Sequence, residues 1–321
     1  MKAFHVTALG ELLIDLTNSG ESAQGNPTFE ANPGGAPCNV LAMLQKLGKR
    51  TAFLGKVGAD AFGHQLADVA ANAGIDLRGL RYDPAIHTTL ACVQTLPGGD
   101  RDFSFYRNPG ADVMLTAEEL DMDRIRDAEI FHFGTLSLTD EPVRSATLAA
   151  VTLAKDSGCL VSFDPNYRAP LWKSQADAKK WIRWGLAQCD ILKIADNELE
   201  LMTGETDFDR GAAILRAQYP NIRLFNVTAG ADGSYSYYAD TKVFRPACRL
   251  GGTIETTGAG DTFCACVLNF VLENGIDGLT EAQLGDMLSF ANTAAYIVTT
   301  KKGAIKSMPE RAQVEELLKR I

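Results

Sequence analysis

Short apolar runs alternate with longer helix-like segments along almost the whole chain. The short runs predict β-strands at Phe4–Leu9, Thr51–Val57, Ile130–Phe133, Leu160–Phe163, Ile191–Ile194 and Leu224–Thr228. The longer segments predict helices at Pro37–Leu47, Ala61–Ala73, Glu141–Ser157, Ala176–Gln188 and Asp209–Tyr219. This alternation predicts an α/β fold with a mostly parallel sheet and helices on both of its faces. Such sheets bind ligands at the carboxyl ends of their strands.

One region departs from this alternation. Thr88–Leu96 and Arg101–Tyr106 have strand patterns and are separated by Pro97-Gly98-Gly99-Asp100, which is typical of a β-hairpin. Leu12–Thr17 and the residues around Phe29 are also extended. We expect a small antiparallel flap of about four strands, too small for a core of its own. Residues 1–321 would then form a single domain, with a lid made from residues 12–33 and 86–109.

Composition and charge narrow the class of protein. The chain has 321 residues, is 46% hydrophobic and carries a formal net charge of −9. This charge argues against sequence-independent binding to nucleic acid or to an anionic membrane. The N-terminus lacks the apolar region of a signal peptide, so we expect a cytoplasmic protein. The seven cysteines contain no CxxC pair and the four histidines have no ligand-like spacing, which argues against a structural zinc site.

A glycine-rich turn near the C-terminus carries the sharpest chemical signal. Thr256-Thr257-Gly258-Ala259-Gly260-Asp261 leads directly into an apolar helical segment, Cys264–Glu273. Small residues before a helix let backbone N–H groups approach a phosphate, and the helix dipole favours the anion. Asp261 would there accept a proton from an attacking hydroxyl, although the spacing alone equally allows a simple helix cap. The GxxxxGK[ST] and GxGxxG motifs are absent, which argues against a Walker-type NTPase and a Rossmann dehydrogenase.

Taken with other segments, this turn resembles the ribokinase-like (PfkB) carbohydrate kinases over essentially the whole chain. The first matching segments are Gly34–Val40 (GGAPCNV), Gly55–Gly58 (GKVG) and Thr256–Asp261. Three others are similar to the fructokinase branch: Phe105–Asp112 (FYRNPGAD), Phe131–Leu138 (FHFGTLSL) and Phe163–Trp172 (FDPNYRAPLW). The resemblance implies ATP-dependent phosphorylation of a sugar primary hydroxyl, with D-fructose to fructose 6-phosphate as the expected reaction.

The resemblance also implies roles for single residues. Asp261 would be the catalytic base, and the backbone amides of Gly258, Ala259 and Gly260 would form an anion hole for the γ-phosphoryl group. The expected sugar-binding residues are Asp15, Gly34, Gly35, Asn39, Arg107, Asp164 and Arg168. Simpler local roles are a helix cap for Asn39, a solvated edge-strand position for Arg107 and surface pairing for Arg168. Phe103 and Phe105 would pack either against the sugar or only within the lid.

The nucleotide and its ions involve a further set. The expected ATP-binding residues are Lys193, Thr228, Gly230, Gly233, Asn292 and Gly303. The chemistry requires Mg²⁺ to screen the ATP phosphates from one another. The family's NxxE element has Ala195 in place of its Asn, whereas Glu198 keeps the Glu and would hold Mg²⁺ through water. Glu255 stands where relatives carry the Asp of a monovalent-cation loop, which makes it a candidate K⁺ ligand.

Several alternatives stay open. The same fold acts on 2-keto-3-deoxygluconate, ribose or nucleosides, and the sequence does not fix the pocket geometry that decides among them. A non-catalytic sugar-binding regulator is a rival of another class, against which the retained Gly258–Asp261 turn argues. A dehydrogenase is a more distant rival. The resemblance also allows a homodimer that pairs through the lid.

Overall fold

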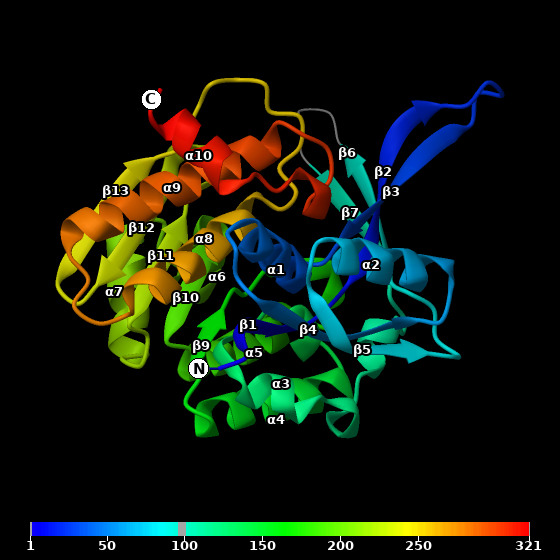
Figure 1. Cartoon of the computed structure of the whole chain (residues 1–321), viewed down its shortest axis with the longest axis horizontal. Coiled ribbons are helices and arrows are strands. Elements are labelled where there is room, and N and C mark those ends of the chain that lie inside the picture. The colour runs from blue at the N-terminus through cyan, green and yellow to red at the C-terminus, as the bar shows by residue number, and fades with distance from the viewer. Residues whose placement is uncertain (1, 96–100, 321) are drawn as a thin grey trace.

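The structure of the protein is a computed structural model that describes residues 2–95 and 101–320 (Figure 1). Within these residues the main sheet has nine strands in the order β13-β12-β11-β10-β9-β8-β1-β4-β5. The pairings from β5 to β11 are parallel, and β12 and β13 are antiparallel, which confirms the predicted mostly parallel sheet. The strands are β1 (Phe4–Leu9), β4 (Thr51–Gly58), β5 (Asp76–Asp83), β8 (Ala128–Phe133), β9 (Leu160–Phe163), β10 (Ile191–Ala195), β11 (Leu224–Thr228), β12 (Gly233–Tyr238) and β13 (Thr241–Pro246).

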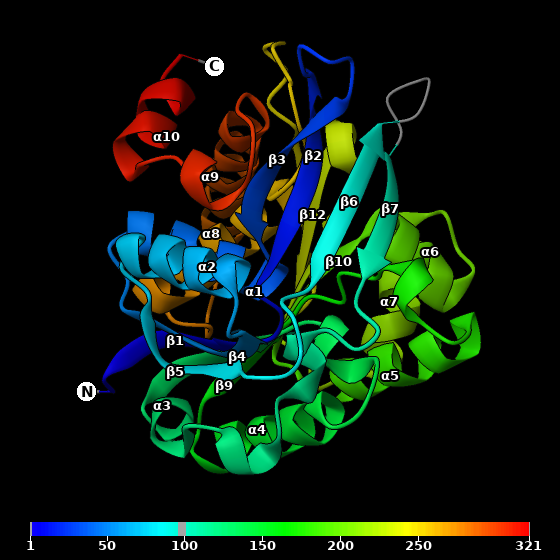
Figure 2. The same cartoon turned by 90° about the vertical axis from the view of Figure 1, so that its right-hand side faces the viewer.

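Helices cover both faces of this sheet (Figure 2). Alternate side chains of a strand point to opposite faces, so Val6 and Ala8 of β1 join one apolar core and Leu9 joins the other. The first core is completed by α1 (Ala36–Lys46), α2 (Ala61–Asn72), α8 (Ala259–Asn274), α9 (Glu281–Thr299) and α10 (Arg311–Leu318). The second is completed by α3 (Met122–Arg126), α4 (Val143–Asp156), α5 (Gln175–Gln188), α6 (Asp196–Thr203) and α7 (Phe208–Gln218).

A second, smaller sheet projects beyond the main one (Figure 1) and is called the small sheet below. Its order is β3-β2-β6-β7, from β2 (Leu13–Glu21), β3 (Pro27–Gly34), β6 (Leu90–Thr95) and β7 (Arg101–Tyr106). The predicted antiparallel flap is wrong at one pairing, because β2 and β6 are parallel. The cause is that β2 and β6 follow β1 and β5, which run in the same direction in the main sheet. The predicted turn at Pro97–Asp100 lies outside the described residues.

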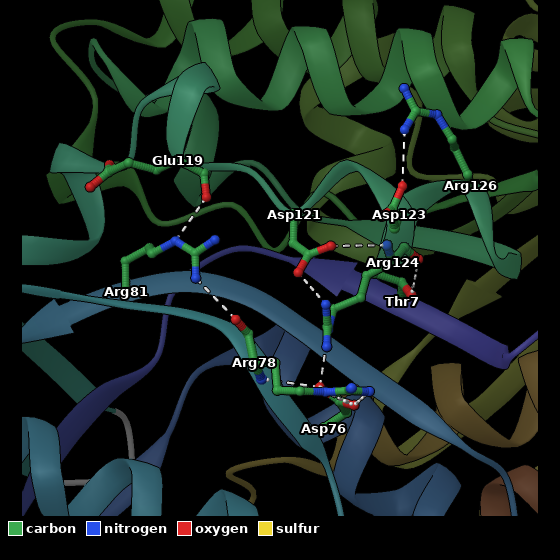
Figure 3. A network of polar contacts seen from close by, with 9 residues as sticks. All are labelled: Thr7, Asp76, Arg78, Arg81, Glu119, Asp121, Asp123, Arg124 and Arg126. Carbon is green, nitrogen blue, oxygen red and sulfur yellow. Dashed lines mark hydrogen bonds and ion pairs between the residues drawn. The ribbon is translucent and has the colours of Figure 1, made fainter.

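The edge strand β5 was not among the predicted strands. Its sequence, DLRGLRYD, is too charged to read as a buried strand, and its charges form a polar network with α3 (Figure 3). Arg124 of α3 donates from Nε to Asp76 Oδ1 at 3.0 Å and also pairs with Asp121. Thr7 Oγ1 donates to the Arg124 carbonyl at 2.8 Å, which ties α3 to the central strand β1. Charged side chains at a sheet edge discourage pairing with another chain.

Among the helices of the described ranges, none combines the length and apolar content needed to span a bilayer.

Candidate active site

The main sheet has a point at which its strand order reverses. From β1 the chain proceeds to β4 and β5 on one side and then returns to β8 on the other. Ligands of open α/β sheets bind beside such a point, at the carboxyl ends of the strands. A cavity of about 650 Å³ lies there, lined by β2, the start of α1, the segments after β9 and β10, and the N-terminus of α8. Cavities of this size hold small ligands and cofactors.

The glycine-rich turn forms one wall of the cavity. Gly258 has φ 80°, in the left-handed region that favours glycine, and α8 begins at the next residue. Thr262 closes the turn, because its backbone N–H and its hydroxyl both donate to the Gly258 carbonyl, at 2.8 and 2.7 Å. A Cβ added at Gly260 would lie 3.2 Å from Lys193 Nζ, so a cation stands directly beside the helix N-terminus. The positive end of the dipole and the ammonium together suit a phosphoryl group.

Asp261 lies in the first turn of α8 and is 8% exposed. Its two carboxylate oxygens each accept a side-chain amide N–H. Asn39 Nδ2 donates to Oδ2 at 2.8 Å and Asn166 Nδ2 donates to Oδ1 at 3.2 Å. The helix-cap alternative for Asn39 is wrong, because α1 begins at Ala36 and the residue at its N-cap is Gly35. The Asn39 Oδ1 atom is buried, without a hydrogen-bond partner in the part of the chain described.

A buried charged layer lies beneath the turn. Lys193 Nζ is 3.1 Å from Asp164 Oδ2, and Lys193 lines the cavity whereas Asp164 lies behind it. Burial raises the pKa of the Asp164 carboxyl. Burial alone would lower the pKa of Lys193, but the negative charges of Asp164, Glu198 and Asp261 outweigh it and raise that pKa. The ammonium therefore stays charged.

His132 lies in the same layer and is 1% exposed. Its Nδ1 is 2.9 Å from Ser162 Oγ. Burial, with a further effect from the Lys193 charge, lowers the pKa of His132 to about 3. The imidazole is therefore neutral at physiological pH and adds no second positive charge beneath the glycine-rich turn.

The two candidate cation ligands lie in different places. Glu198 lines the cavity, and its carboxylate oxygens accept backbone N–H groups from Tyr167 at 2.7 Å and Ala195 at 2.8 Å. Glu255 joins two loops, because it accepts the Thr257 hydroxyl and the Gly303 N–H, the latter at 3.1 Å. No cluster of three or more His, Cys, Asp or Glu able to hold a metal ion occurs in residues 2–95 and 101–320.

Asp15, Gly34 and Gly35 lie together near the start of α1. Asp15 lines the cavity from β2, and a Cβ added at Gly34 would lie 2.6 Å from Asp15 Oδ2. Gly35 has φ 123°, and its Cβ would lie 2.3 Å from the Glu11 carbonyl oxygen. Glycine at position 34 therefore leaves room for the Asp15 carboxylate, and glycine at position 35 leaves room for the Glu11 backbone.

Glu11 is a site residue that the sequence analysis missed. It is 3% exposed, lines the cavity and accepts the Ala36 N–H on Oε1 at 2.7 Å. Burial raises the pKa of Glu11 to about 7. The available signal was a carboxylate placed directly after the first strand, at its carboxyl end. Asn166 was missed too, although it stands in the quoted segment Phe163–Trp172.

The two arginines expected at the sugar are placed differently. Arg168 lines the cavity, as does Phe105. Arg107 lies outside that lining, and its side chain is 2% exposed, so it is not a solvated edge-strand residue. Its guanidinium donates to Asp112 Oδ2 at 2.7 Å, to Thr139 Oγ1 at 2.8 Å and to the Leu136 carbonyl at 2.9 Å. The Phe103 side chain is outside the described part of the structure.

Besides Lys193, four of the residues expected at the nucleotide line the cavity: Thr228, Gly230, Gly233 and Asn292. The Asn292 side chain joins α9 to β12 and β13. Its Oδ1 accepts the Ser234 hydroxyl at 2.9 Å, and its Nδ2 donates to the Arg245 and Pro246 carbonyls at 3.1 Å each. Gly303 lies outside the cavity lining, and a Cβ there would be 3.2 Å from Asn32 Oδ1 of β3. The assignment of these residues to the nucleotide stays a prediction.

The chain is similar to known carbohydrate kinases in both sequence and fold. The sequence profile of the pfkB family of carbohydrate kinases matches residues 3–311. Fructokinase-2 from Solanum habrochaites is 42% identical over 320 residues, which cover 98% of this chain and 96% of that protein. A double-mutant fructokinase from Vibrio cholerae O395, solved with fructose, ADP and a potassium ion, superposes with a TM-score of 0.88 at 28% identity over 99% of both chains.

A third relative has a different substrate. Aminoimidazole riboside kinase from Salmonella enterica, solved with aminoimidazole riboside and an ATP analog, has a TM-score of 0.82 at 27% identity. The match covers 98% of this chain and 99% of that one. The fold is thus shared among kinases of different sugars, whereas the sequence match over nearly the full length is to fructokinases. The chain belongs to the pfkB family of carbohydrate kinases, within its fructokinase-like branch.

Proposed function

We propose that this protein transfers the γ-phosphoryl group of ATP to the primary hydroxyl of D-fructose, which gives fructose 6-phosphate. The observation that carries the proposal is the joint placement of Asp261, the Gly258–Gly260 turn and Lys193 on one cavity wall. A base, a set of backbone donors and a cation at one point are the groups that phosphoryl transfer to a hydroxyl requires. The likeness to a fructokinase solved with fructose and ADP supports the choice of sugar.

In this proposal Asp261 removes the proton of the fructose hydroxyl as that oxygen attacks the γ-phosphorus. The carboxylate is held by Asn39 and Asn166, so it needs little reorganisation when the hydroxyl arrives. The backbone N–H groups at Gly258–Gly260 and the Lys193 ammonium stabilise the negative charge that builds on the phosphoryl oxygens. The proton leaves to Asp261, and the phosphorus–oxygen bond to ADP breaks as the bond to fructose forms.

A divalent cation fits this wall without a protein cage. Mg²⁺ is commonly held by one or two carboxylates, waters and the substrate phosphates themselves. Glu198 is suitably placed, because two backbone N–H groups fix its carboxylate in the cavity wall and lone pairs are left for ordered water. When bound with ATP, the ion supplies positive charge that screens the phosphates from one another. The proposed K⁺ site at Glu255 rests on the sequence alone.

The part of the cavity lined by Glu11 and Asp15 favours a neutral sugar. Glu11 and Asp15 place two carboxyl groups there, which suit the hydroxyls of a polyol. An anionic sugar acid such as 2-keto-3-deoxygluconate would need a cation at that end. Of the two arginines expected at the sugar, Arg107 is already neutralised by Asp112 in a buried pair, which leaves the guanidinium of Arg168 in the lining against the two carboxyl groups. Fructose is therefore preferred over the sugar acid, and the small sheet would close over it and exclude water.

The proposal is tested by Asp261→Asn, which keeps the shape of the side chain and removes its basicity. We expect kcat for ATP-dependent fructose phosphorylation to fall by about 10³-fold, within the range that general base catalysis contributes. ATP binding, measured by calorimetry, should stay near that of the unmodified protein. Asp277→Asn is the control, because that side chain is 89% exposed and lies at the surface. Near-normal turnover of a folded Asp261→Asn protein would contradict the proposal.

A further inference from the structure

The carboxylate of Asp261 is held from two directions by two asparagines of different origin. Asn39 comes from α1 on one face of the sheet, and Asn166 comes from the segment after β9. Asn166 Nδ2 is 3.2 Å from Oδ1, the oxygen that Asn39 does not contact. Each oxygen therefore accepts one amide N–H, and the plane of the carboxylate is set by both. Asn166 stands in the segment Phe163–Trp172 that resembles the fructokinase branch, but its contact with Asp261 follows only from the structure.

Several contacts fix the position of Asn166 itself. Its φ is 48°, one of the uncommon left-handed conformations that Asn tolerates better than most residues. Its backbone N–H donates to Asp164 Oδ1 at 3.3 Å, and the next N–H, from Tyr167, donates to Glu198 at 2.7 Å. On the other side, the Pro165 carbonyl accepts the Thr135 N–H at 3.1 Å. The segment is bonded on both flanks of Asn166, so its amide is presented in a defined place.

The charges around Asp261 explain why a neutral donor is useful there. Asp164 and Lys193 lie beneath it, on the segments of β9 and β10, and Cys264 lies one turn along α8. Lys193 supplies the attractive charge and Asp164 opposes it. An amide N–H donated to a carboxylate favours the charged form without adding a net charge near the phosphates. An aspartate at position 166 would do the opposite, because it would place a second anion about 3 Å from Oδ1.

We propose that Asn166 is a positioning residue for the base: its amide holds the Asp261 carboxylate in the orientation that meets the approaching sugar hydroxyl. This inference rests on the proposed role of Asp261. Asn39 would share the task through its own hydrogen bond to the other carboxylate oxygen, Oδ2. Asn166 would act through Asp261 alone.

Two substitutions distinguish the effect of the Asn166 side-chain amide from the effect of its backbone conformation. Asn166→Gly removes the amide and keeps the left-handed conformation accessible. Asn166→Asp keeps the shape of the side chain and replaces the donor with an acceptor. For Asn166→Gly we expect kcat to fall by at least about ten-fold, as for loss of a hydrogen bond to a charged group, with KM for fructose little changed. For Asn166→Asp we expect a larger fall, and the acidic limb of the kcat–pH profile should move to higher pH.

The matched control is Asn274→Asp, at the exposed far end of the same helix. It should leave both kcat and the pH profile unchanged. The inference is overturned if the Asn166 variants keep the kcat and pH profile of the unmodified protein. It is also overturned if they lose activity only in proportion to lost folded protein, with an unmoved acidic limb. Failure of the proposed function would look different, because Asp261→Asn itself would then keep its turnover.

Discussion

Two of the buried ion pairs differ in what surrounds their cations. Lys193 and Asp164 lie beneath the N-terminus of α8, and the ammonium group faces the cavity. Arg107 and Asp112 lie where β7 leaves the small sheet, and the guanidinium is enclosed by protein. The sequence analysis assigned Arg107, Asp164 and Lys193 alike to ligands. The structure separates them by what surrounds each cation.

The difference comes from the acceptors that the protein supplies. The guanidinium of Arg107 is a planar fork with five N–H groups, and Asp112, Thr139 and the Leu136 carbonyl all accept from it. Asp112 also accepts the hydroxyl of Thr89, so one carboxylate joins the beginning of β6 to the end of β7. This pair therefore fastens the root of the hairpin. Lys193, a compact charge beside Gly260, is placed to meet a ligand.

Of the two ion pairs, the one beneath α8 is expected to give the larger loss of activity, and Lys193→Met tests it. Removing one preorganised donor from the phosphoryl site should lower kcat/KM for ATP by about 10²–10³-fold. The fold should persist, because burial already raises the pKa of Asp164 and the carboxyl can take a proton when its partner is gone. Steady-state kinetics with circular dichroism measures both. Lys242→Met, at a half-exposed surface pair, is the control, and an equal loss in both variants would contradict the assignment.

A different outcome is expected from Asp112→Asn at the root of the small sheet. This change leaves the Arg107 charge buried without its counter-ion, which should lower the free energy of unfolding by about 3–5 kcal/mol. Urea denaturation measures it. Asp123→Asn, at an exposed pair with Arg126 (Figure 3), should cost less than about 1 kcal/mol. If Asp112→Asn instead left stability intact and raised KM for fructose sharply, Arg107 would be a substrate ligand after all.

The smallest effect concerns Glu11, which lies between the two regions. Its folded-state pKa of about 7 lies above its ordinary value of 4.5, so the folded protein binds more protons in that window. The free energy of unfolding should therefore fall as pH rises through it. Glu11→Gln keeps the acceptor for the Ala36 N–H and removes the titration. Its stability relative to the unmodified protein should rise by about 2–3 kcal/mol between about pH 5 and about pH 8.

The control for this pH experiment is Glu315→Gln, an exposed position on α10. Surface substitutions of this kind usually change stability by less than about 0.5 kcal/mol. Equal pH dependence of Glu11→Gln and the unmodified protein would show that burial of Glu11 does not set the pKa.

Much of the fold was readable because its signals are local. Strands such as β9 and β11 are continuous apolar runs, and the structure places them at the predicted residues. The edge strand β5 was not predicted because its charged side chains form the network with α3 and do not pack in a core. The parallel pairing of β2 with β6 was not predicted because it depends on the directions of the preceding strands, β1 and β5.

The site residues likewise divide into those with a local sequence signal and those whose contacts are long-range. The Gly258–Asp261 turn is contiguous, and both its glycines and its helix can be read from neighbouring residues. The contact of Asn39 with Asp261 spans 222 positions in the chain, and that of Asn166 spans 95. Such contacts follow from the packing of elements and leave no periodic trace. The contacts of Arg107 with Thr139 and Leu136 could not be predicted for the same reason, since these residues meet only in the folded structure.

The central claim, that this cavity phosphorylates fructose, is tested most directly by one measurement. ADP formation with ATP and Mg²⁺ is followed for fructose, ribose and 2-keto-3-deoxygluconate, and kcat/KM is compared. The two carboxyl groups of Glu11 and Asp15 in the lining predict the highest kcat/KM for fructose and the lowest for the anionic acid. A clear preference for 2-keto-3-deoxygluconate or ribose would contradict the account of the sugar site, and absence of ADP formation with every sugar would contradict the proposed function.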